Sequence, residues 1–375
     1  MYIFDLIRGM YRLSKDILDT VIYYDVLDFP LTAFEVWKHL LTLQEVFHPS
    51  SYRDVFSALC VLVQQGVICE ESGFYRLPDR LTVVNARIQR EKLSVAKLKR
   101  VKRLGRLMYF IPYVRFVGAT GSLSLKHGDI ESDWDMFVVL RSEKIWTGRI
   151  ILTGILFILG KWRHGNRIRN RACLNYFVTD DSLEVGMHDL FSAHEYRFMI
   201  PLFNYPLFQR FELKNRWIAT MKPNFSLSEI PPLWMNMDQR PVWIRSMLER
   251  WIDFFDIESR LSVWQRSKIA RNPKTHWVGS YIETSSRALI FLPRPRGPRV
   301  YELLKNDLVL CKIFEILFLC GILQKWNEKK KYKKSAICLD IIIRSRTSRL
   351  GKPLVVNGKQ KMSMISLLLC VHLVL

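Results

Sequence analysis

The sequence predicts the α+β fold class, in three regions that span residues 1–90, 91–225 and 226–375. In the first region, three segments with helical spacing of apolar residues precede a short hairpin pattern. In the second, apolar runs of strand length alternate with helical segments, which is typical of a mixed sheet covered by helices. In the third, an amphipathic and Trp-rich stretch indicates helices with a basic surface. We therefore expect a mixed-sheet core between a small N-terminal domain and a helical, basic C-terminal region.

The elements expected in the first region have the order of a winged helix. Helical spacing covers residues 14–27, 33–41 and 51–66, and two strand-like runs around a Ser-Gly turn follow within residues 67–77. A winged helix often reads DNA with its third helix, and phosphate contacts supply much of the affinity. Here the third helix carries one basic residue, Arg53, and the region has 9 Lys and Arg against 11 Asp and Glu. A structural or protein-contact role is therefore favoured over DNA binding, which stays open as an alternative.

The charge of the whole chain favours anionic partners. The 375 residues carry 57 Lys and Arg against 35 Asp and Glu, a formal net charge of +22. A basic body attracts the phosphates of a nucleotide, a nucleic acid or a membrane surface, and net charge alone does not distinguish them. Residues 91–106 concentrate this charge on one amphipathic helix pattern. That helix is expected either to join two domains as a solvated connector or to form an electropositive wall beside a phosphate site.

Cysteine usage and the lengths of the apolar runs predict a cytoplasmic protein. The number of cysteines, seven, is odd, and no two of them have the CxxC spacing, so neither a disulfide framework nor a zinc site is expected. The longest apolar runs, at residues 150–160, 308–323 and 364–375, are shorter than the roughly 20 residues that cross a bilayer. The N-terminal sequence lacks the pattern of a secretory signal. We expect reduced thiols, buried helices and no transmembrane segment.

The middle region alternates strand and helix patterns. An apolar strand is followed by a very short helix, a second strand, a long buried helix and, after a basic loop, a third strand. Two further helical segments follow the third strand. These elements are expected, in order, at residues 113–120, 122–126, 133–140, 145–162, 173–178, 182–199 and 205–221.

Two aspartates one residue apart open the second of these strands, in the sequence SDWDMFVVL. Side chains alternate faces along a strand, so Asp133 and Asp135 point the same way with Trp134 opposite. Carboxylates held roughly 6 to 7 Å apart repel one another, and burying them without a cation costs several kcal/mol. Divalent ions are the natural partners, because hard oxygen ligands suit Mg²⁺ that is shared with substrate phosphates.

A Gly-Ser pair precedes the aspartates, at the junction between the first strand and the short helix. Glycine lets the backbone approach a phosphate closely, and the N–H groups at a helix start favour an anion. Gly121 and Ser122 are therefore expected to hold a triphosphate, and Lys126 is within reach of its β- or γ-phosphate. A solvated surface position is the simpler alternative for Lys126.

Together these residues resemble a known signature. Gly121 and Ser122, about ten further residues, and an Asp-x-Asp that opens an apolar strand are similar to the motif of the DNA polymerase β-like nucleotidyltransferase superfamily. A wider likeness to bacterial nucleotidyltransferase-domain proteins covers residues 14–225. The resemblance implies a nucleotidyltransferase mixed-sheet core and Mg²⁺-dependent transfer of a nucleotidyl group from a nucleoside triphosphate to an acceptor hydroxyl. Two Mg²⁺ ions are then the expected cofactors, Asp133 and Asp135 their ligands, and the acceptor is unidentified.

The third carboxylate that this superfamily usually has is not evident in the sequence. The strand at residues 173–178 offers Asn175 in its place, and Asp180 follows the strand, so these two are the candidates for a further metal ligand. For Asp180, a place in the turn after the strand is the favoured alternative. An amide binds a metal ion less strongly than a carboxylate and takes up no proton. Two alternatives to catalysis therefore stay open. One is a degenerate protein that senses nucleotides or binds a partner, and the other is a DNA-binding regulator that uses the first region.

The last region combines an amphipathic segment with strongly basic sequence. Helical spacing covers residues 241–266, and the Pro-rich residues 293–299 are expected to form an exposed turn or linker. The tail after Glu328 has eleven Lys or Arg and a single acid, Asp340, without a clear period. We draw no function from this tail.

Overall fold

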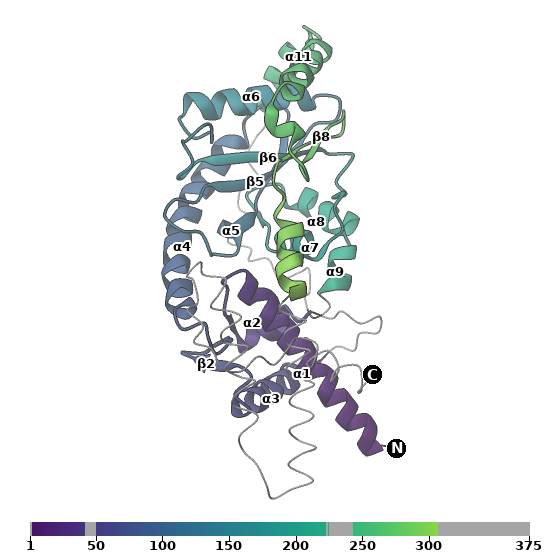
Figure 1. The fold of residues 1–375 in the computed structure, drawn as a ribbon. Helices are drawn as coiled ribbons and strands as arrows, with labels where there is room; N and C mark the ends of the chain where they lie inside the picture. The colour runs from purple at the N-terminus through teal and green to yellow at the C-terminus, as the bar shows by residue number, and fades with distance from the viewer. Residues whose placement is uncertain (1, 42–49, 223, 225–242, 307–375) are drawn as a thin grey trace, which may run out of the picture. The chain divides into compact units, whose positions relative to one another are not determined.

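The structure of the chain is a computed structural model, and it has the expected α+β fold class. A six-stranded mixed sheet is covered by helices, and a separate three-stranded sheet is antiparallel throughout (Figure 1). The residues that the structure describes are 2–41, 50–222, 224 and 243–306. All of them belong to one compact unit, Met1–Leu308.

Three helices and the small antiparallel sheet make up the first region, which confirms the predicted helices and hairpin. α3 begins after Ser51, whose side chain accepts a hydrogen bond from the backbone N–H of Asp54, and α2 begins at a capping box between Thr32 and Glu35. One strand, β1, was missed because two residues are too few to show a period of two. The elements are α1 (Tyr2–Val26), β1 (Leu31–Thr32), α2 (Ala33–Lys38), α3 (Tyr52–Gln64), β2 (Cys69–Glu71) and β3 (Phe74–Arg76), with strand order β1-β3-β2.

The large sheet has the strand order β7-β4-β5-β6-β9-β8. β5 and β6 are parallel neighbours joined through α6 (Ile145–Ile158), and the other neighbouring strands are antiparallel. Figure 1 shows β5 and β6 side by side in the core. The strands are β4 (Val114–Ala119), β5 (Trp134–Leu140), β6 (Ala172–Thr179), β7 (Ile200–Pro201), β8 (Tyr281–Thr284) and β9 (Ala288–Leu292).

The large sheet separates two apolar cores, one on each face. Along β5, Met136 and Val138 point into the first core and Phe137 points into the second. The first core is completed by α6 and α4 (Val83–Met108), and the second by α7 (Leu190–Arg197), α8 (Tyr205–Lys214) and α9 (Trp217–Met221). Alternation along β5 therefore directs Trp134 into the first core and Asp135 toward the face that α7 covers.

The helices after β6 are shorter than the helical spacing predicts. α7 begins after Asp189, whose side chain accepts a hydrogen bond from the N–H of Ser192, so the segment before residue 189 is not helical. The single helix expected at residues 205–221 is two helices that meet at Asn215. The amide of Asn215 donates to Leu183 O and accepts from the N–H of Val185, both at 2.9 Å, and so binds the segment after β6 at the break.

β8 and β9 correct the expectation that the region after residue 226 is helical. They extend the large sheet, because β9 pairs with β6 and β8 with β9. Runs of four and five residues in a Pro- and Trp-rich stretch give too weak a pattern for a strand prediction. The helix expected at residues 241–266 is divided into α10 (Trp243–Asp253) and α11 (Glu258–Ala270), with Asp256 between them at φ +41°. The turn expected at 293–299 is helical from residue 296 onward.

None of the described helices combines the length and the apolar character needed to cross a bilayer. The apolar runs at residues 308–323 and 364–375 lie outside the described residues, as does the tail after Glu328. What the sequence predicts for them stays a prediction.

Candidate functional site

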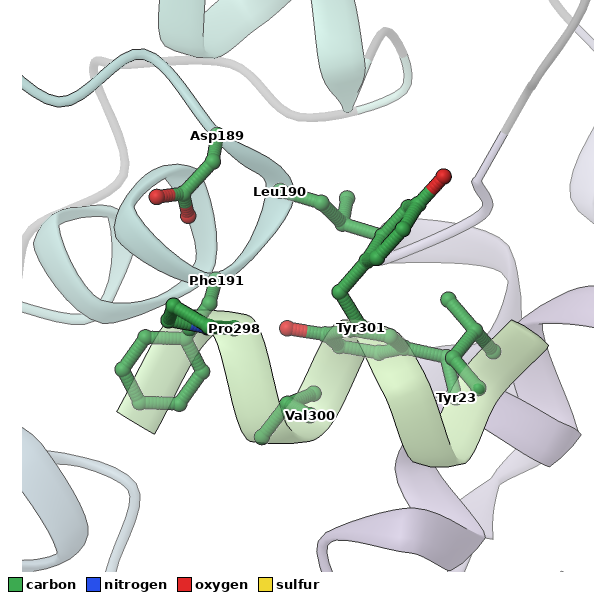
Figure 2. A pocket seen from close by; sticks show the side chains of 9 residues that line it. Tyr23, Asp189, Leu190, Phe191, Pro298, Val300 and Tyr301 are labelled. Atoms are coloured by element: carbon green, nitrogen blue, oxygen red, sulfur yellow. The ribbon is translucent and has the colours of Figure 1, made fainter. Parts of the chain in front are cut away.

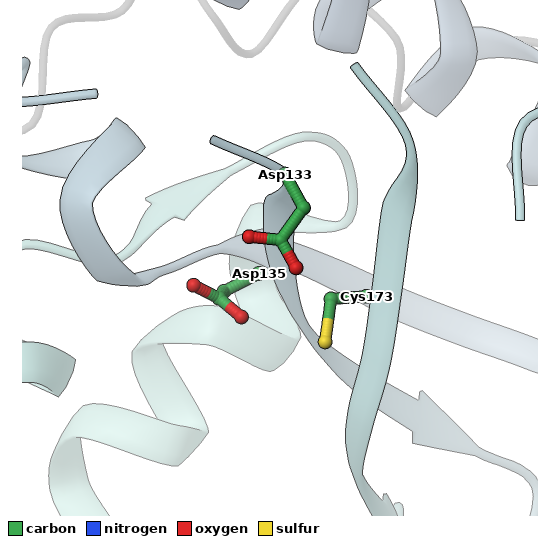
Figure 3. Close-up of side chains that lie close together, drawn as sticks. All are labelled: Asp133, Asp135 and Cys173. Carbon is green, nitrogen blue, oxygen red and sulfur yellow. The ribbon is translucent and has the colours of Figure 1, made fainter. Parts of the chain in front are cut away.

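Asp133 and Asp135 lie at the N-terminal end of β5, in the middle of the large sheet. One carboxylate oxygen of each and the sulfur of Cys173 all lie within 4.8 Å of one another. Cys173 is the residue opposite Asp135 on β6. Figure 3 shows the two carboxylates on one strand and the thiol on the neighbouring strand. The sequence predicted that the two aspartates share a face, and their ligand atoms do lie together.

The Gly-Ser turn lies directly against this pair. Gly121 has φ +65°, and a Cβ at this position would lie 2.5 Å from Asp135 Oδ2. The backbone N–H of Thr120 donates to Asp135 O at 2.9 Å, so the end of β4 and the start of β5 are joined at this point. Only glycine combines this backbone conformation with so close an approach to a carboxylate. The turn and the short helix α5 (Gly121–Ser124) therefore meet the aspartates at one place.

The two other predicted phosphate ligands are positioned differently. Ser122 is partly buried in α5, and its carbonyl accepts a hydrogen bond from the N–H of His127 at 2.7 Å. Lys126 is exposed, has φ +54°, and its Nζ lies 3.4 Å from Glu91 Oε1 on α4. The structure therefore brings Gly121 and Ser122 to the aspartates and directs Lys126 toward α4.

A buried lysine of α4 holds the loop that leads into Asp133. Lys97 Nζ donates to Ile130 O at 3.1 Å and to Ser132 O at 2.8 Å. Burial lowers the pKa of Lys97, while these carbonyls satisfy its ammonium. Ser94, one turn earlier, accepts from the N–H of Gly128 at 2.9 Å. The basic helix is thus more than a solvated connector, because its inward side chains fix the loop between α5 and β5.

Arg163 pairs with the first aspartate and was missed by sequence reasoning. Its Nη1 lies 2.6 Å from Asp133 Oδ2 and donates to Cys173 Sγ at 3.1 Å. Arg163 comes from the basic loop at residues 163–171, and the N–H of Arg163 donates to Ala172 O at the start of β6. Basic composition was the only signal in the sequence, and it marked the whole loop rather than one residue. A guanidinium therefore neutralises part of the acidic pair.

Of the two candidates for a further metal ligand, the structure brings one to the pair. Asn175 Nδ2 lies 3.4 Å from Asp135 Oδ1. The pairing of β5 with β6 is irregular at this point, because Met136 faces Leu174 and Phe137 faces Tyr176. Asn175 is the extra residue of a β-bulge, a feature that redirects a side chain.

Asp180 lies at the opposite edge of the sheet. Asp180 follows Thr179, which pairs with Leu140 at the far end of β5. Along the strands, Asp180 is roughly 20 Å from the residue pair Asp135–Cys173. There Asp180 Oδ1 accepts a hydrogen bond from the N–H of Ser142 at 2.9 Å. Asp180 is therefore too distant to share a metal ion with the aspartates.

The thiol of Cys173 is a poor partner for a hard cation. Burial raises its pKa well above the ordinary value, and the charges of Asp135 and Asp133 raise it further. The group therefore stays a protonated thiol at neutral pH, and a neutral sulfur is a weak ligand for Mg²⁺. The oxygen atoms of the two aspartates remain as the hard donors at this place, and Asn175 faces Asp135 Oδ1 with its Nδ2.

A third carboxylate, Glu195, shares the electrostatic field of the pair. Burial raises the pKa of Asp135 to about 6, and the neighbouring charge of Asp133 adds to the rise. Burial likewise raises the pKa of Glu195 to about 7, and here the charge of Asp135 adds to it. The guanidinium of Arg296 acts in the opposite direction on both groups. Sequence reasoning looked for a third carboxylate only on and after the strand at residues 173–178, and so it did not consider Glu195 on α7.

A separate cavity of about 220 Å³ lies beside the start of α7. Its walls are mainly apolar and come from Tyr23, residues 189–191 and the helix that begins at residue 296, as Figure 2 shows. Neither Asp133 nor Asp135 lines it. This cavity is therefore distinct from the acidic site on β5.

Comparison of the chain with models of known protein families, with curated proteins and with solved structures found no match. Function is therefore inferred from the site itself.

Proposed function

We propose that this chain is a Mg²⁺-dependent nucleotidyltransferase that moves a nucleotidyl group from a nucleoside triphosphate to an acceptor hydroxyl. The observation that carries the proposal is the contact between the Gly-Ser turn and Asp135, beside Asp133 at the start of the same strand. A backbone turn that suits phosphates and a pair of carboxylates that suits divalent ions meet at one place.

The donor set fits Mg²⁺. Asp133 and Asp135 supply carboxylate oxygens. Asn175 faces Asp135 Oδ1 with its Nδ2, so it would supply its amide oxygen as a further neutral ligand only after rotation of the amide group. Oxygen ligands at the end of a rigid, buried strand match the preference of Mg²⁺, whereas the protonated thiol of Cys173 does not. Bound Mg²⁺ would supply positive charge that neutralises the carboxylates and the phosphate oxygens.

The residues of the chain have separate tasks in this proposal. The backbone of Gly121 and Ser122 binds the phosphates, and Arg163 adds a guanidinium that pairs with phosphate oxygens. Glu195, with a pKa of about 7, accepts the proton of the acceptor hydroxyl, because a base is most effective when its pKa lies near the working pH. Loss of this proton makes the acceptor oxygen a stronger nucleophile. This oxygen then forms a bond to the α-phosphorus of the nucleoside triphosphate while the bond to the β-phosphate oxygen breaks, and pyrophosphate leaves with the negative charge.

Release of pyrophosphate tests the proposal. The protein is incubated with Mg²⁺, each common nucleoside triphosphate and pools of acceptors that comprise nucleotides, sugars, antibiotics, RNA ends and proteins. We expect release by the wild-type protein, and a loss on the order of 10²- to 10³-fold in Asp133→Asn and Asp135→Asn. Asp180→Asn is the matched control, since it makes the same chemical change at the other edge of the sheet and should keep full activity. Retained turnover in Asp133→Asn would remove the metal role.

The ion pair between Arg163 and Asp133 favours a second candidate function. A site whose first aspartate is already neutralised, with Asn175 where a carboxylate is expected, suits a degenerate protein that binds nucleotides without turning them over. Calorimetry separates the two functions. Binding of a nucleoside triphosphate with Mg²⁺, together with no pyrophosphate release from any acceptor pool, would support the sensor and contradict the enzyme.

The first region fits a protein contact better than a DNA contact. α3 exposes the aromatic side chains of Tyr52 and Phe56, and its single cation, Arg53, is followed by the exposed acid Asp54. Phosphate backbones are bound by several cations rather than one. A salt-sensitive shift of duplex DNA that is lost on removal of residues 1–90 would reverse this preference.

A further inference from the structure

Helix α10 packs against the rest of the protein through its charged side. Glu249 lies at the centre of this contact, where both of its carboxylate oxygens accept hydrogen bonds from Arg115 at 2.8 Å. The N–H of Tyr113 donates to the same side chain at 2.7 Å. Burial raises the pKa of Glu249, but the hydrogen bonds from Arg115 and Tyr113 outweigh it and leave the pKa below the ordinary value. One turn later, Asp253 pairs with Lys144 at 3.0 Å.

The opposite side of α10 is apolar and exposed to solvent. Its side chains recur at the spacing of one helix face and are Trp243, Ile244, Met247, Leu248 and Trp251. The exposed fraction of Trp251 is 67%. This is the reverse of the usual arrangement, in which the apolar stripe of a surface helix faces the core. Because the charged residues of α10 form its contacts with the rest of the protein, its apolar side remains available to a partner.

The turn after α10 continues the apolar surface. Phe254 is 83% exposed and Phe255 is 54% exposed, and both lie between α10 and α11. Val263 and Trp264 on α11 are exposed as well. We call the exposed apolar side chains of α10, this turn and α11 the aromatic face.

Most of the exposed charged side chains in the same segment of the chain are cations. In residues 243–278, the exposed charged side chains comprise one acid, Asp256, and six bases: Arg250, Arg260, Arg266, Lys268, Arg271 and Lys274. The other acids of this stretch are used inside the protein. Glu258, for example, accepts hydrogen bonds from the N–H groups of Trp146 and Thr147 at the start of α6, each at 2.9 Å. The exposed surface of this segment therefore combines large apolar side chains with an excess of positive charge.

We propose that the aromatic face binds the surface of an anionic phospholipid bilayer. Trp and Phe side chains enter the boundary between headgroups and acyl chains, and Arg and Lys pair with the anionic headgroups. The inward ion pairs of α10 hold the helix on the protein with its apolar side outward, so no refolding is needed for insertion. The aromatic face lies on the membrane surface, and none of the described helices is long and apolar enough to span a bilayer.

Charge distinguishes this occupant from two others. Residues 307–375 carry 13 Lys and Arg against 4 Asp and Glu, so the net charge of this segment has the same sign as the exposed cations. A second copy of the chain would bring the same cations to the contact. An anionic bilayer instead offers charge opposite to that of the exposed cations and an apolar layer for the exposed Trp and Phe side chains.

Sedimentation with vesicles tests the proposal on the full-length chain. We expect the protein to bind vesicles of equimolar phosphatidylserine and phosphatidylcholine, and not vesicles of phosphatidylcholine alone. Trp251→Ser and Phe254→Ser should each weaken binding by roughly tenfold, because each removes a large apolar side chain from the bilayer boundary. The double variant Arg260→Glu with Arg271→Glu should also weaken vesicle binding, and the loss should be larger in low salt than in high salt. Leu213→Ser on α8 is the matched control: Leu213 is as exposed as Phe255, and binding should not change.

Three results would overturn the proposal. The first is equal binding to both kinds of vesicle, and the second is undiminished binding by the Trp251 and Phe254 variants. The third is no binding to either vesicle. If that third result is accompanied by a dimer in sedimentation equilibrium that Trp251→Ser dissociates, the aromatic face is an interface between two copies. Far-ultraviolet circular dichroism of each variant confirms that it is folded. Pyrophosphate release in the absence of vesicles is independent of this face, so failure of one proposal leaves the other standing.

Discussion

Replacing Gly121 by alanine tests the close approach on which the proposed nucleotide site depends. A Cβ at this position would lie 2.5 Å from Asp135 Oδ2 and 3.1 Å from Asp135 Cβ. Ordinary contact begins at 3.4 Å, so the carboxylate oxygen has to retreat by about 0.9 Å (3.4 − 2.5). Rotation of the side chain alone does not relieve the contact with Cβ, because Cβ is fixed to the strand backbone. Gly121→Ala should therefore displace the carboxylate that the proposal assigns to the metal.

The expected loss of stability has two parts. An alanine at positive φ costs about 1 kcal/mol relative to glycine, and moving Asp135 out of its preferred rotamer costs about 1 kcal/mol more. Gly66→Ala separates them, because Gly66 has φ +70° and no atom within 4 Å of an added Cβ. We expect the free energy of unfolding in urea to fall by about 2 kcal/mol in Gly121→Ala and by about 1 kcal/mol in Gly66→Ala.

Binding and activity distinguish the two variants more sharply than stability. A displacement of about 1 Å in a catalytic group lowers the rate about 10²-fold, so Gly121→Ala should lose most pyrophosphate release and bind Mg²⁺ with a nucleoside triphosphate more weakly in calorimetry. Gly66→Ala should match the wild type in both measurements. Equal losses of stability in the two variants, together with unchanged Mg²⁺ binding in Gly121→Ala, would refute the contact between the turn and Asp135.

Three further predictions concern the groups around the aspartates. The pKa of Asp135 is raised from 3.8 to about 6 in the folded protein, so its contribution to stability is present below pH 4 and is lost as the pH rises through 6. In urea unfolding without Mg²⁺, measured across that pH range, Asp135→Asn should remove this loss of stability. A pH profile that is unchanged in Asp135→Asn would contradict the prediction. Arg163→Ala should strengthen the binding of Mg²⁺ alone by roughly tenfold in calorimetry, because the ion pair with Asp133 no longer competes with the metal ion. Arg169→Ala is the control, since Arg169 lies in the same loop but pairs with Glu131, and it should leave the Mg²⁺ affinity unchanged. Equal Mg²⁺ affinities in the two variants would argue against competition. Lys97→Met should lower the free energy of unfolding by about 2 kcal/mol, because the loop carbonyls lose a charged hydrogen-bond donor. Lys99 is exposed, so Lys99→Met should change the free energy of unfolding little. A small effect in both variants would mean that the loop does not depend on Lys97.

Short-range signals account for the parts of the site that the sequence located. Gly121 and Ser122 at a strand end, and two aspartates separated by one residue, are defined by neighbours along the chain. Alternation along a strand is enough to place Asp133 and Asp135 on one face. Caps act at the same range, and Ser51 and Thr32 mark helix starts that the structure contains.

The partners of those residues come from distant parts of the chain. Arg163 reaches Asp133 because the loop before β6 returns to the start of β5, and Glu195 joins the field of Asp135 because α7 covers that face of the sheet. Helical spacing also predicts that α10 is amphipathic. From that pattern alone the apolar side would be expected to face the protein interior, whereas in the structure it is exposed. The ion pairs of Glu249 with Arg115 and Arg141, more than 100 residues away in the chain, decide which side faces in.

The sequence by itself determined the fold class, the first three helices with their hairpin, and the identity of the acidic pair and its glycine turn, because each depends on periodicity or spacing within a few residues. Only the tertiary structure decided that β8 and β9 complete the large sheet, that Asp180 lies at its far edge, and that Arg163 and Asn175 contact the aspartates. Strand pairing and helix packing join segments that have no mutual pattern in the chain, since hydrogen bonds and buried area between them exist only once the sheet has formed.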